Sequence, residues 1–136
     1  MKPKKKKNKH AGRFIGEVET RWLSDHRRML LIKTIHYRDP RGVLWTAKKG
    51  LIFDGGSKPK VLWSIAGSPF TGPGRRAYVL HDAYYQGQDR PRVEVDFMMW
   101  EASISDGMSK RQAHREHFIV RRFGGATWRS RKKKNK

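Results

Sequence analysis

The sequence contains no cysteine among its 136 residues, so disulfide bonds and thiolate metal sites are excluded and an intracellular protein is expected. Acidic residues are also scarce, with 12 Asp or Glu against 32 Lys or Arg. Long hydrophobic runs are missing too. The longest aliphatic run, residues 29–32, is far too short for a secretory signal or a membrane span. The chain is therefore predicted to be soluble and not exported through a signal peptide.

The excess of basic residues gives a formal net charge of +20 and is concentrated at both ends. Residues 1–9 and 129–136 each carry six Lys or Arg and no acid, yet the part between them still has a net charge of +8. Charge runs at chain ends are often solvated, disordered segments, so the basic body is the more informative observation. The predicted phosphate-binding residues at the two ends are Lys4, Lys5, Lys6, Lys7, Arg129, Arg131, Lys132, Lys133 and Lys134.

A charge of this size creates a long-range field that attracts polyanions. Nucleic acid is the expected partner, and its binding would depend steeply on salt because each neutralised phosphate releases counterions. Anionic lipid and an acidic protein surface are the alternatives. Neither the oligomeric state nor a cofactor can be inferred from the composition.

The order of the patterns predicts one α+β domain over residues 13–128, flanked by a disordered basic arm (residues 1–12) and a disordered basic tail (residues 129–136). A small antiparallel sheet is expected in the first half, from short β-branched and aromatic runs at residues 13–19, 29–37, 43–45 and 51–53. Asp39-Pro40-Arg41-Gly42 predicts a turn between two of these strands. Residues 54–74 are rich in Gly and Pro and predict a loop, with one short helical turn at residues 61–65.

Three helices are expected in the second half. The first covers residues 75–85, and the second covers residues 92–105 after Pro91. The second helix is predicted to pack through Val93, Asp96, Phe97, Trp100 and Ile104. The third starts at Ser109, whose spacing to Gln112 is typical of a capping box, and is predicted to end before Gly124.

The candidate catalytic residues are His81, Tyr85 and Asp96 on the first two helices. Asp96 lies among apolar residues, where a carboxylate needs a partner, and His81 on the facing helix is the natural one. Such a pair could orient an imidazole for acid–base chemistry, and it could equally be a structural link between helices. Asp82 points about 100° away from His81 around the helix, which suits a metal ion or an arginine.

A second candidate feature is the loop segment that begins with Asp54-Gly55-Gly56-Ser57. Its simplest interpretation is an Asx turn, in which the Asp54 carboxylate accepts from backbone N–H groups. The functional interpretation has Asp54 and Ser57 entering the same pocket as His81. No strand–elbow–helix pattern surrounds Ser57, which disfavours it as an acyl nucleophile.

These residues resemble a family found largely in phages and prophages, domain-of-unknown-function family number thirteen fifty-three. The shared pattern consists of D-G-x-S-x-P at residues 54–59, A-x-x-x-H-D-x-x-Y at residues 77–85 and E-x-D at residues 94–96. The resemblance covers residues 50–128. It implies a phage or prophage source and a place in the virion or the host cytoplasm, but no activity.

A more distant resemblance is to phospholipases of the A2 type, which also place H-D-x-x-Y on one helix and an Asp on the next. It implies that His81 activates water, that Asp96 orients His81 with support from Tyr85, and that Asp82 holds calcium through oxygen ligands. Gly72-Pro73-Gly74 is similar to part of the calcium loop of those enzymes, but it lies only seven residues before His81.

Three functions follow from these patterns. The first is a small basic protein of phage origin that binds a polyanion, most simply nucleic acid, and contains a hydrolase-like pocket. The second is an ester hydrolase of the phospholipase A2 type or of another type. The third is a protein that inhibits a host nucleic-acid-binding factor by presenting a basic, aromatic-rich surface.

Overall fold

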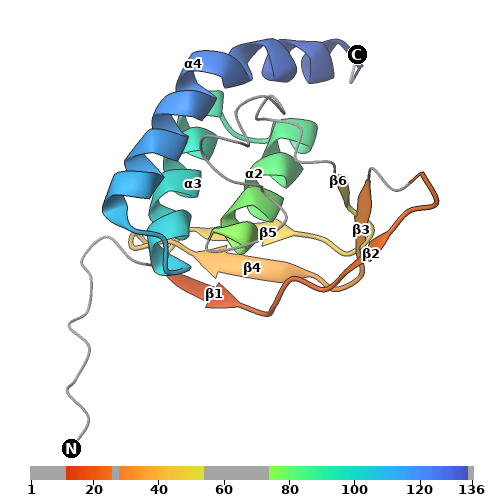
Figure 1. Cartoon of the computed structure of the whole chain (residues 1–136), viewed down its shortest axis with the longest axis horizontal. Coiled ribbons are helices and arrows are strands. Elements are labelled where there is room, and N and C mark those ends of the chain that lie inside the picture. Colours follow the sequence, from red (N-terminus) through yellow and green to blue (C-terminus); the bar gives the residue numbers. More distant parts are fainter. Residues whose placement is uncertain (1–11, 26–27, 54–73, 135–136) are drawn as a thin grey trace, which may run out of the picture.

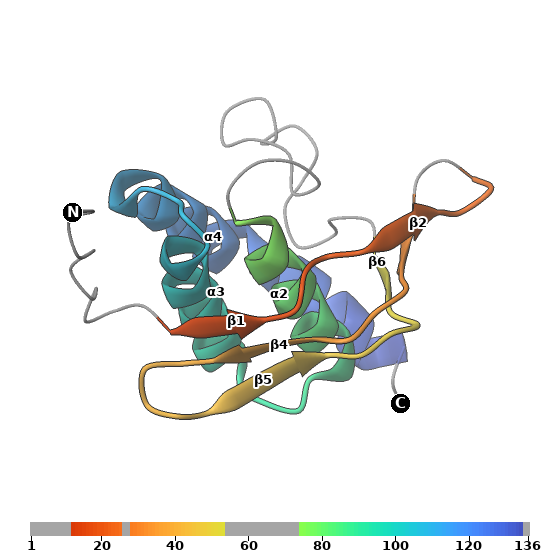
Figure 2. The ribbon, with the colours of Figure 1, turned by 90° about the horizontal axis from the view of Figure 1, so that it is seen from below.

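The computed structural model describes residues 12–25, 28–53 and 74–134. Within these ranges, six short strands are followed by three helices, which confirms the predicted α+β class. Figure 1 shows the helices lying over one face of a small sheet, and Figure 2 shows that sheet from the other side. The predicted basic arm, apart from Gly12, and nearly all of the predicted loop at residues 54–74 lie outside the described residues.

The sheet beneath the helices consists of β1 (Arg13–Ile15), β4 (Ile35–Arg38) and β5 (Leu44–Ala47), with β4 in the centre. All its pairings are antiparallel. The turn predicted after β4 is confirmed. Gly42 takes a φ of +90°, and its N–H donates to the carbonyl of Asp39 at 2.9 Å.

A second antiparallel sheet contains β2 (Thr20–Trp22), β3 (Met29–Leu31) and β6 (Ile52–Phe53). One sheet was predicted, and two form because the expected strand over residues 29–37 is divided. β3 pairs with β2 and β6, whereas β4 pairs with β1 and β5. Leu31 and Ile35, on either side of the break, are both fully buried, so each sheet contributes to the core.

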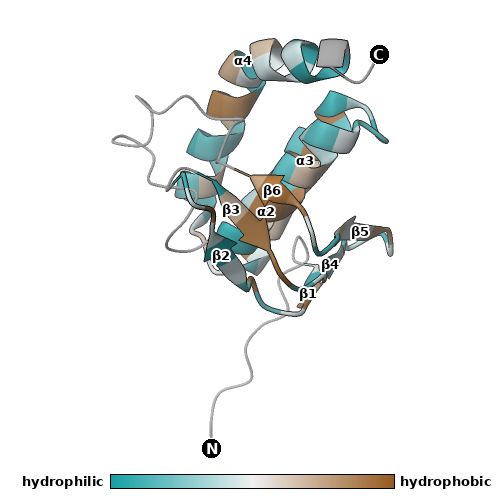
Figure 3. Ribbon diagram, turned by 90° about the vertical axis from the view of Figure 1, so that its right-hand side faces the viewer, coloured by the Kyte–Doolittle hydropathy of each residue, from teal (hydrophilic) through white to brown (hydrophobic). Residues whose placement is uncertain are grey.

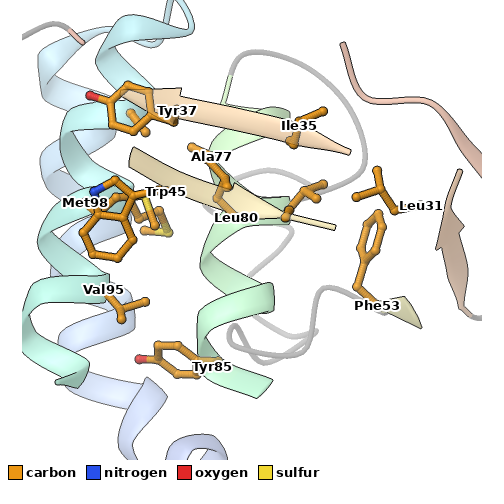
Figure 4. Close-up of a cluster of buried hydrophobic side chains, with 14 of the residues drawn as sticks. Leu31, Ile35, Tyr37, Trp45, Phe53, Ala77, Leu80, Tyr85, Val95 and Met98 are labelled. Carbon is orange, nitrogen blue, oxygen red and sulfur yellow. The ribbon is translucent and has the colours of Figure 1, made fainter. Parts of the chain in front are cut away.

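The hydrophobic core lies between the first sheet and the helices α2 (Arg75–Gly87) and α3 (Arg92–Ser105). Figure 4 shows Tyr37 and Trp45 of the sheet facing side chains of both helices, including Leu80 and Met98. Fully burying a side chain such as Leu or Met contributes about 1.5–3 kcal/mol, so these contacts fix the helices on the sheet.

The predicted packing face of α3 is wrong in part. Val93 is 57% exposed and Phe97 is 41% exposed, whereas the core takes up the next face of the helix. That face presents Val95, Met98, Met99 and Ala102, all fully buried together with Asp96. The contact of Asp96 with His81 of α2 is compatible with this rotation of α3, in which Val93 and Phe97 remain on the surface.

The third helix, α4 (Lys110–Lys134), begins as predicted, with the Ser109 hydroxyl accepting from the Gln112 N–H at 3.1 Å. It does not end before Gly124, and residues 129–134 are helical where a disordered tail was predicted. Figure 1 shows that α4 first runs beside α3 and then changes direction to pass over the helix layer. Figure 3 shows hydrophilic and hydrophobic residues alternating along it, as in an amphipathic helix.

Gly124 is in α4 because of a close approach and not as a helix terminator. A Cβ atom at this position would lie 2.6 Å from the Tyr85 hydroxyl oxygen. Beyond it, the ring of Trp128 contacts the edge of the Tyr85 ring, with centroids 5.0 Å apart. These tertiary contacts continue the helix past its glycine pair, which the sequence pattern alone did not predict. Among the described residues, no helix is both long enough and apolar enough to span a bilayer.

Candidate functional site

The predicted pairing of His81 with Asp96 is present in the structure. α2 and α3 lie side by side, and the His81 Nε2 atom is 2.7 Å from Asp96 Oδ1. Tyr85, one helical turn after His81, donates its hydroxyl to the same oxygen at 2.7 Å. The three candidate residues are therefore brought together, while their catalytic role stays a prediction.

Two arginines complete the surroundings of Asp96. Arg121 of α4 donates from Nη1 to Oδ2 at 2.7 Å, and the Nε atom of Arg92 lies 3.5 Å from the same oxygen. Arg92 also donates to the Tyr85 hydroxyl at 3.1 Å and to the backbone carbonyls of Val120 and Arg121 at 3.0 and 2.6 Å. The carboxylate thus joins all three helices.

We call this set the Asp96 network; its members are His81, Tyr85, Arg92, Asp96 and Arg121. Arg92 was a foreseeable ion-pair partner from its spacing, but Arg121 was not. It lies 25 residues after Asp96, and no pattern near either residue indicates the contact.

The Asp96 network is enclosed, and this determines its charge state. Asp96 and Tyr85 are fully buried, and His81 is 1% exposed. Burial by itself would raise the pKa of Asp96, but the hydrogen bonds from His81, Tyr85 and Arg121 outweigh it and lower the pKa below its usual value. Burial, followed by the charge of Asp96, raises the pKa of the Tyr85 hydroxyl. Asp96 is therefore ionised and Tyr85 protonated at neutral pH.

This arrangement is suited to holding an imidazole in one orientation. The contact of Nε2 with Asp96 fixes the plane of the His81 ring, as general acid–base chemistry requires. The same contacts also satisfy a buried carboxylate and join three helices, which is what a structural link requires. The geometry accommodates both alternatives that the sequence left open.

Asp82 does not fit the calcium role implied by the phospholipase resemblance. Its Oδ1 accepts from Arg131 Nη1 at 2.8 Å, and its Oδ2 accepts from Gln86 Nε2 at 2.7 Å. Asp82 is buried, so the Arg131 guanidinium takes the position beside the carboxylate that a cation would need. Across the described part of the chain, no cluster of three or more His, Asp or Glu has the proximity of a metal site.

The Asp82 contact also changes the prediction for the basic tail. Arg131, predicted to bind phosphate, forms a partly buried ion pair within the protein instead. Arg129 and Lys132 are exposed, and Lys133 and Lys134 lie in the last turn of α4. The other predicted site residues, Lys4, Lys5, Lys6, Lys7, Asp54 and Ser57, are outside the described residues.

The strongest charge feature that the structure describes is α4 itself. The helix contains ten Lys or Arg and a single acid, Glu116. Glu116 is buried and accepts a hydrogen bond from the Tyr78 hydroxyl, so its carboxylate is not exposed among the surface cations of the helix. The exposed cations define what we call the α4 basic face; they are Lys110, Arg111, Arg115, Arg122, Arg129 and Lys132.

Two clefts lie near these features. One of about 440 Å³ is bordered by Arg92, Trp128 and Lys132, next to the Asp96 network. The other, of about 400 Å³, lies between the β4–β5 turn and α3 and is bordered by Arg41, Arg90 and Phe97. Both openings carry positive side chains and an aromatic ring, and acids also border them: Asp89 the first, Asp39 and Glu94 the second.

The fold and the site define a small α+β protein whose helices are joined by a buried His–Asp–Arg network and whose last helix is strongly cationic. The chain belongs to the family described as "Protein of unknown function (DUF1353)", whose model matches residues 29–120. The match covers β3 to the middle of α4 and includes His81, Asp96 and Glu116.

Two curated relatives come from Sinorhizobium fredii (strain NBRC 101917 / NGR234), and both are described as uncharacterized proteins. The chain is 31% identical to y4iH over 120 residues, which are 88% of this chain and 49% of that protein. It is 28% identical to y4jT over 114 residues, which are 84% of this chain and 32% of that protein. The chain thus spans about half or less of each relative. No solved structure matches.

Proposed function

We propose that this chain binds a polyanion, and that nucleic acid is the polyanion that fits it best. The observation that carries the proposal is the composition of α4, with ten basic residues and one acid that is buried and hydrogen-bonded. Exposed cations of one sign on a rigid helix attract phosphates and release counterions when they bind. The basic ends of the chain add to the same attraction.

The spacing of the α4 basic face supports contact with a regular phosphate backbone. Arg111, Arg115 and Arg122 stand at positions i, i+4 and i+11, so their side chains leave the same side of the helix. The planar guanidinium group can donate two parallel hydrogen bonds to one phosphate, which favours Arg over Lys at such sites.

A lipid surface is a poorer fit for α4. A helix that lies on a membrane inserts a continuous apolar side, but Ala113, Ile119 and Val120 are buried against the rest of the protein. The exposed rings of Phe118 and Phe123 point about 140° apart around the helix and do not form one apolar side. The phage or prophage origin suggested by the sequence motifs agrees with a nucleic-acid-binding role, and the host cytoplasm or the virion is the proposed location.

Fluorescence anisotropy with a labelled 30-nucleotide DNA tests the proposal. Substituting Arg111→Glu and Arg115→Glu together should weaken binding at least about tenfold, because two phosphate contacts become repulsive. The control is Arg21→Glu with Lys49→Glu, two exposed cations in or near the second sheet, which changes the net charge equally. Figures 1 and 2 show β2 at the other end of the molecule from the start of α4. If both double variants lose DNA affinity equally, binding depends on the net charge of the protein and not on α4, which would contradict the proposed site.

Ester hydrolysis is the second candidate function, and the contact between His81 and Asp96 is the observation that favours it. In this role Asp96 would orient the His81 imidazole, which would act as the general base toward an attacking water. Since His81 is 1% exposed, substrate would reach it only if the surrounding chain moved.

The test is turnover of chromogenic carboxylic and phosphodiester substrates, compared between the wild-type protein and His81→Gln. The control is His36→Gln on β4, whose imidazole contacts Thr46 and lies outside the Asp96 network. Hydrolysis that is lost only in His81→Gln would support an enzyme. Turnover that survives in His81→Gln would exclude this residue as the base.

A further inference from the structure

A row of aromatic rings lies where α3 and α4 meet; Phe97, His114 and Phe118 are exposed, and Trp100 between them is half-buried. Phe97 and Trp100 stack with ring centroids 5.6 Å apart, and Trp100 contacts His114 of α4 at 5.5 Å. One turn after His114, Phe118 is 67% exposed. We call these four residues the aromatic strip: Phe97, Trp100, His114 and Phe118. The core does not use this face of α3, although its apolar pattern predicted burial.

Cationic side chains border the aromatic strip on both sides. The Arg41 guanidinium lies 5.4 Å from the centre of the Phe97 ring. On α4, Arg115 is adjacent to His114, and Arg122 is one turn beyond Phe118 on the basic face defined above. The strip therefore combines flat apolar rings with positive charges, and it is continuous with the surface proposed to bind phosphates.

We infer that the aromatic strip binds single-stranded nucleic acid by stacking unpaired bases on its rings while the neighbouring arginines hold the phosphates. This inference rests on the proposed function and specifies its ligand. Proteins that bind single strands combine a cationic track with exposed aromatic rings, because every base has a face that can stack. In a duplex the base faces are covered by their neighbours, so exposed rings would add little to its binding.

The cleft beside Phe97 extends the strip. Its volume is about 400 Å³, and Arg41 and Arg90 line it together with Phe97. Two acids, Asp39 and Glu94, also border it, but each is paired with one of these arginines, at 3.1 and 3.8 Å. Arg41 is also paired with Glu101, at 2.6 Å, so a phosphate that reaches Phe97 would meet guanidinium groups that are exposed and already ion-paired.

The experiment compares a fluorescein-labelled 20-nucleotide single strand with the corresponding duplex, both titrated with the full chain in 100 mM salt. Phe97→Ala with Phe118→Ala should weaken single-strand binding about tenfold and duplex binding less than about twofold. Both residues are on the surface, and circular dichroism of the variant verifies that it folds.

Phe123→Ala is the matched control. Phe123 is also exposed on α4, at 45%, but five residues after Phe118 it points about 140° away around the helix. It should leave single-strand binding within about twofold of the wild-type value. As a second measurement, photocrosslinking of a bromodeoxyuridine-containing strand should attach to α3 and to residues 114–118, and not to β2 or β3.

Four results would overturn the inference. The first is equal affinity of the wild-type protein for the single strand and the duplex, and the second is an equal loss of single-strand binding in Phe123→Ala. The third is that photocrosslinks are confined to the second sheet. The fourth is that Phe97→Ala with Phe118→Ala loses binding to phosphatidylglycerol vesicles but not to DNA. If the wild-type protein binds both DNA probes and the Phe97→Ala with Phe118→Ala variant binds them equally well, this inference fails and the proposed function stands. No binding of either probe at 50 mM salt would instead remove the proposed function.

Discussion

Among single residues, Asp96 has the largest structural consequence. Its carboxylate accepts from His81, Tyr85 and Arg121 while it is fully buried, and these donors come from two other helices. A buried charge with good partners adds little beyond an apolar substitute, but removal of one partner leaves the others unsatisfied. The position therefore tolerates very little change.

Asp96→Ala should lower the free energy of unfolding by about 3–5 kcal/mol, because it removes the shared acceptor of the buried His81 and Tyr85 and of two partly exposed arginines. Urea denaturation at pH 7 measures the change. The control is Glu17→Gln, which removes an exposed ion pair with Arg76 and should cost less than about 1 kcal/mol. Similar values for the two variants would contradict the role assigned to Asp96.

The lowered pKa of Asp96 also predicts a pH dependence. A carboxyl group with a depressed pKa in the folded protein stabilises it above the unfolded value of 3.8, and this contribution is lost as the pH falls through the folded pKa. The wild-type protein should lose more stability than Asp96→Asn between pH 6 and pH 3 in urea denaturation. Asp39, whose pKa is also lowered, contributes equally to both proteins. If the free energy of unfolding of both proteins falls equally between pH 6 and pH 3, the pKa of Asp96 is not lowered in the folded protein.

At the scale of elements, the glycine pair in α4 shows whether helix propensity or tertiary contact determines the stability of this helix. Helix propensity alone predicts that Gly124→Ala stabilises α4 by about 1 kcal/mol. The structure predicts the opposite sign, because the new Cβ would lie 2.6 Å from a Tyr85 hydroxyl that Asp96 and Arg92 hold in place. We expect a loss of about 1–3 kcal/mol in the free energy of unfolding.

Gly125→Ala is the control for this prediction. Its Cβ would meet only the ends of the Arg129 and Arg92 side chains, at 3.2 and 3.3 Å, and the former can move aside. Thermal unfolding should therefore show a clearly lower melting temperature for Gly124→Ala than for Gly125→Ala. The reverse order would mean that Tyr85 does not approach the helix as closely as described.

For the whole molecule, the sequence predicted contacts between neighbouring elements better than contacts between distant ones. The pairing of His81 with Asp96 followed from two amphipathic helices joined by a short connection, and the β4–β5 turn followed from Asp39 to Gly42. The contacts of Arg121 and Arg131 depend on how α4 crosses the other helices, which local patterns do not specify.

The errors have a common physical cause. Gly124 favoured a helix end, and the run of basic residues after it favoured disorder, but burial of Trp128 against Tyr85 and the ion pair of Arg131 with Asp82 maintain the helix. Likewise, Val93 and Phe97 had the spacing of a buried stripe, but the side of α3 that packs into the core presents Val95, Met98 and Ala102. Tertiary packing decided between local alternatives in each case.

The proposed function depends on the molecule acting as a polycation through α4, and the salt dependence of binding tests this most directly. The dissociation constant for a single-stranded 30-mer should be measured from 50 to 300 mM salt for the wild-type protein and for Arg111→Glu with Arg115→Glu. The logarithm of affinity should fall linearly with that of salt concentration, with a slope of about −0.7 per neutralised phosphate. The variant should have a slope smaller by about 1.4. Binding that is absent or insensitive to salt, or an identical slope in the variant, would contradict a phosphate-binding α4.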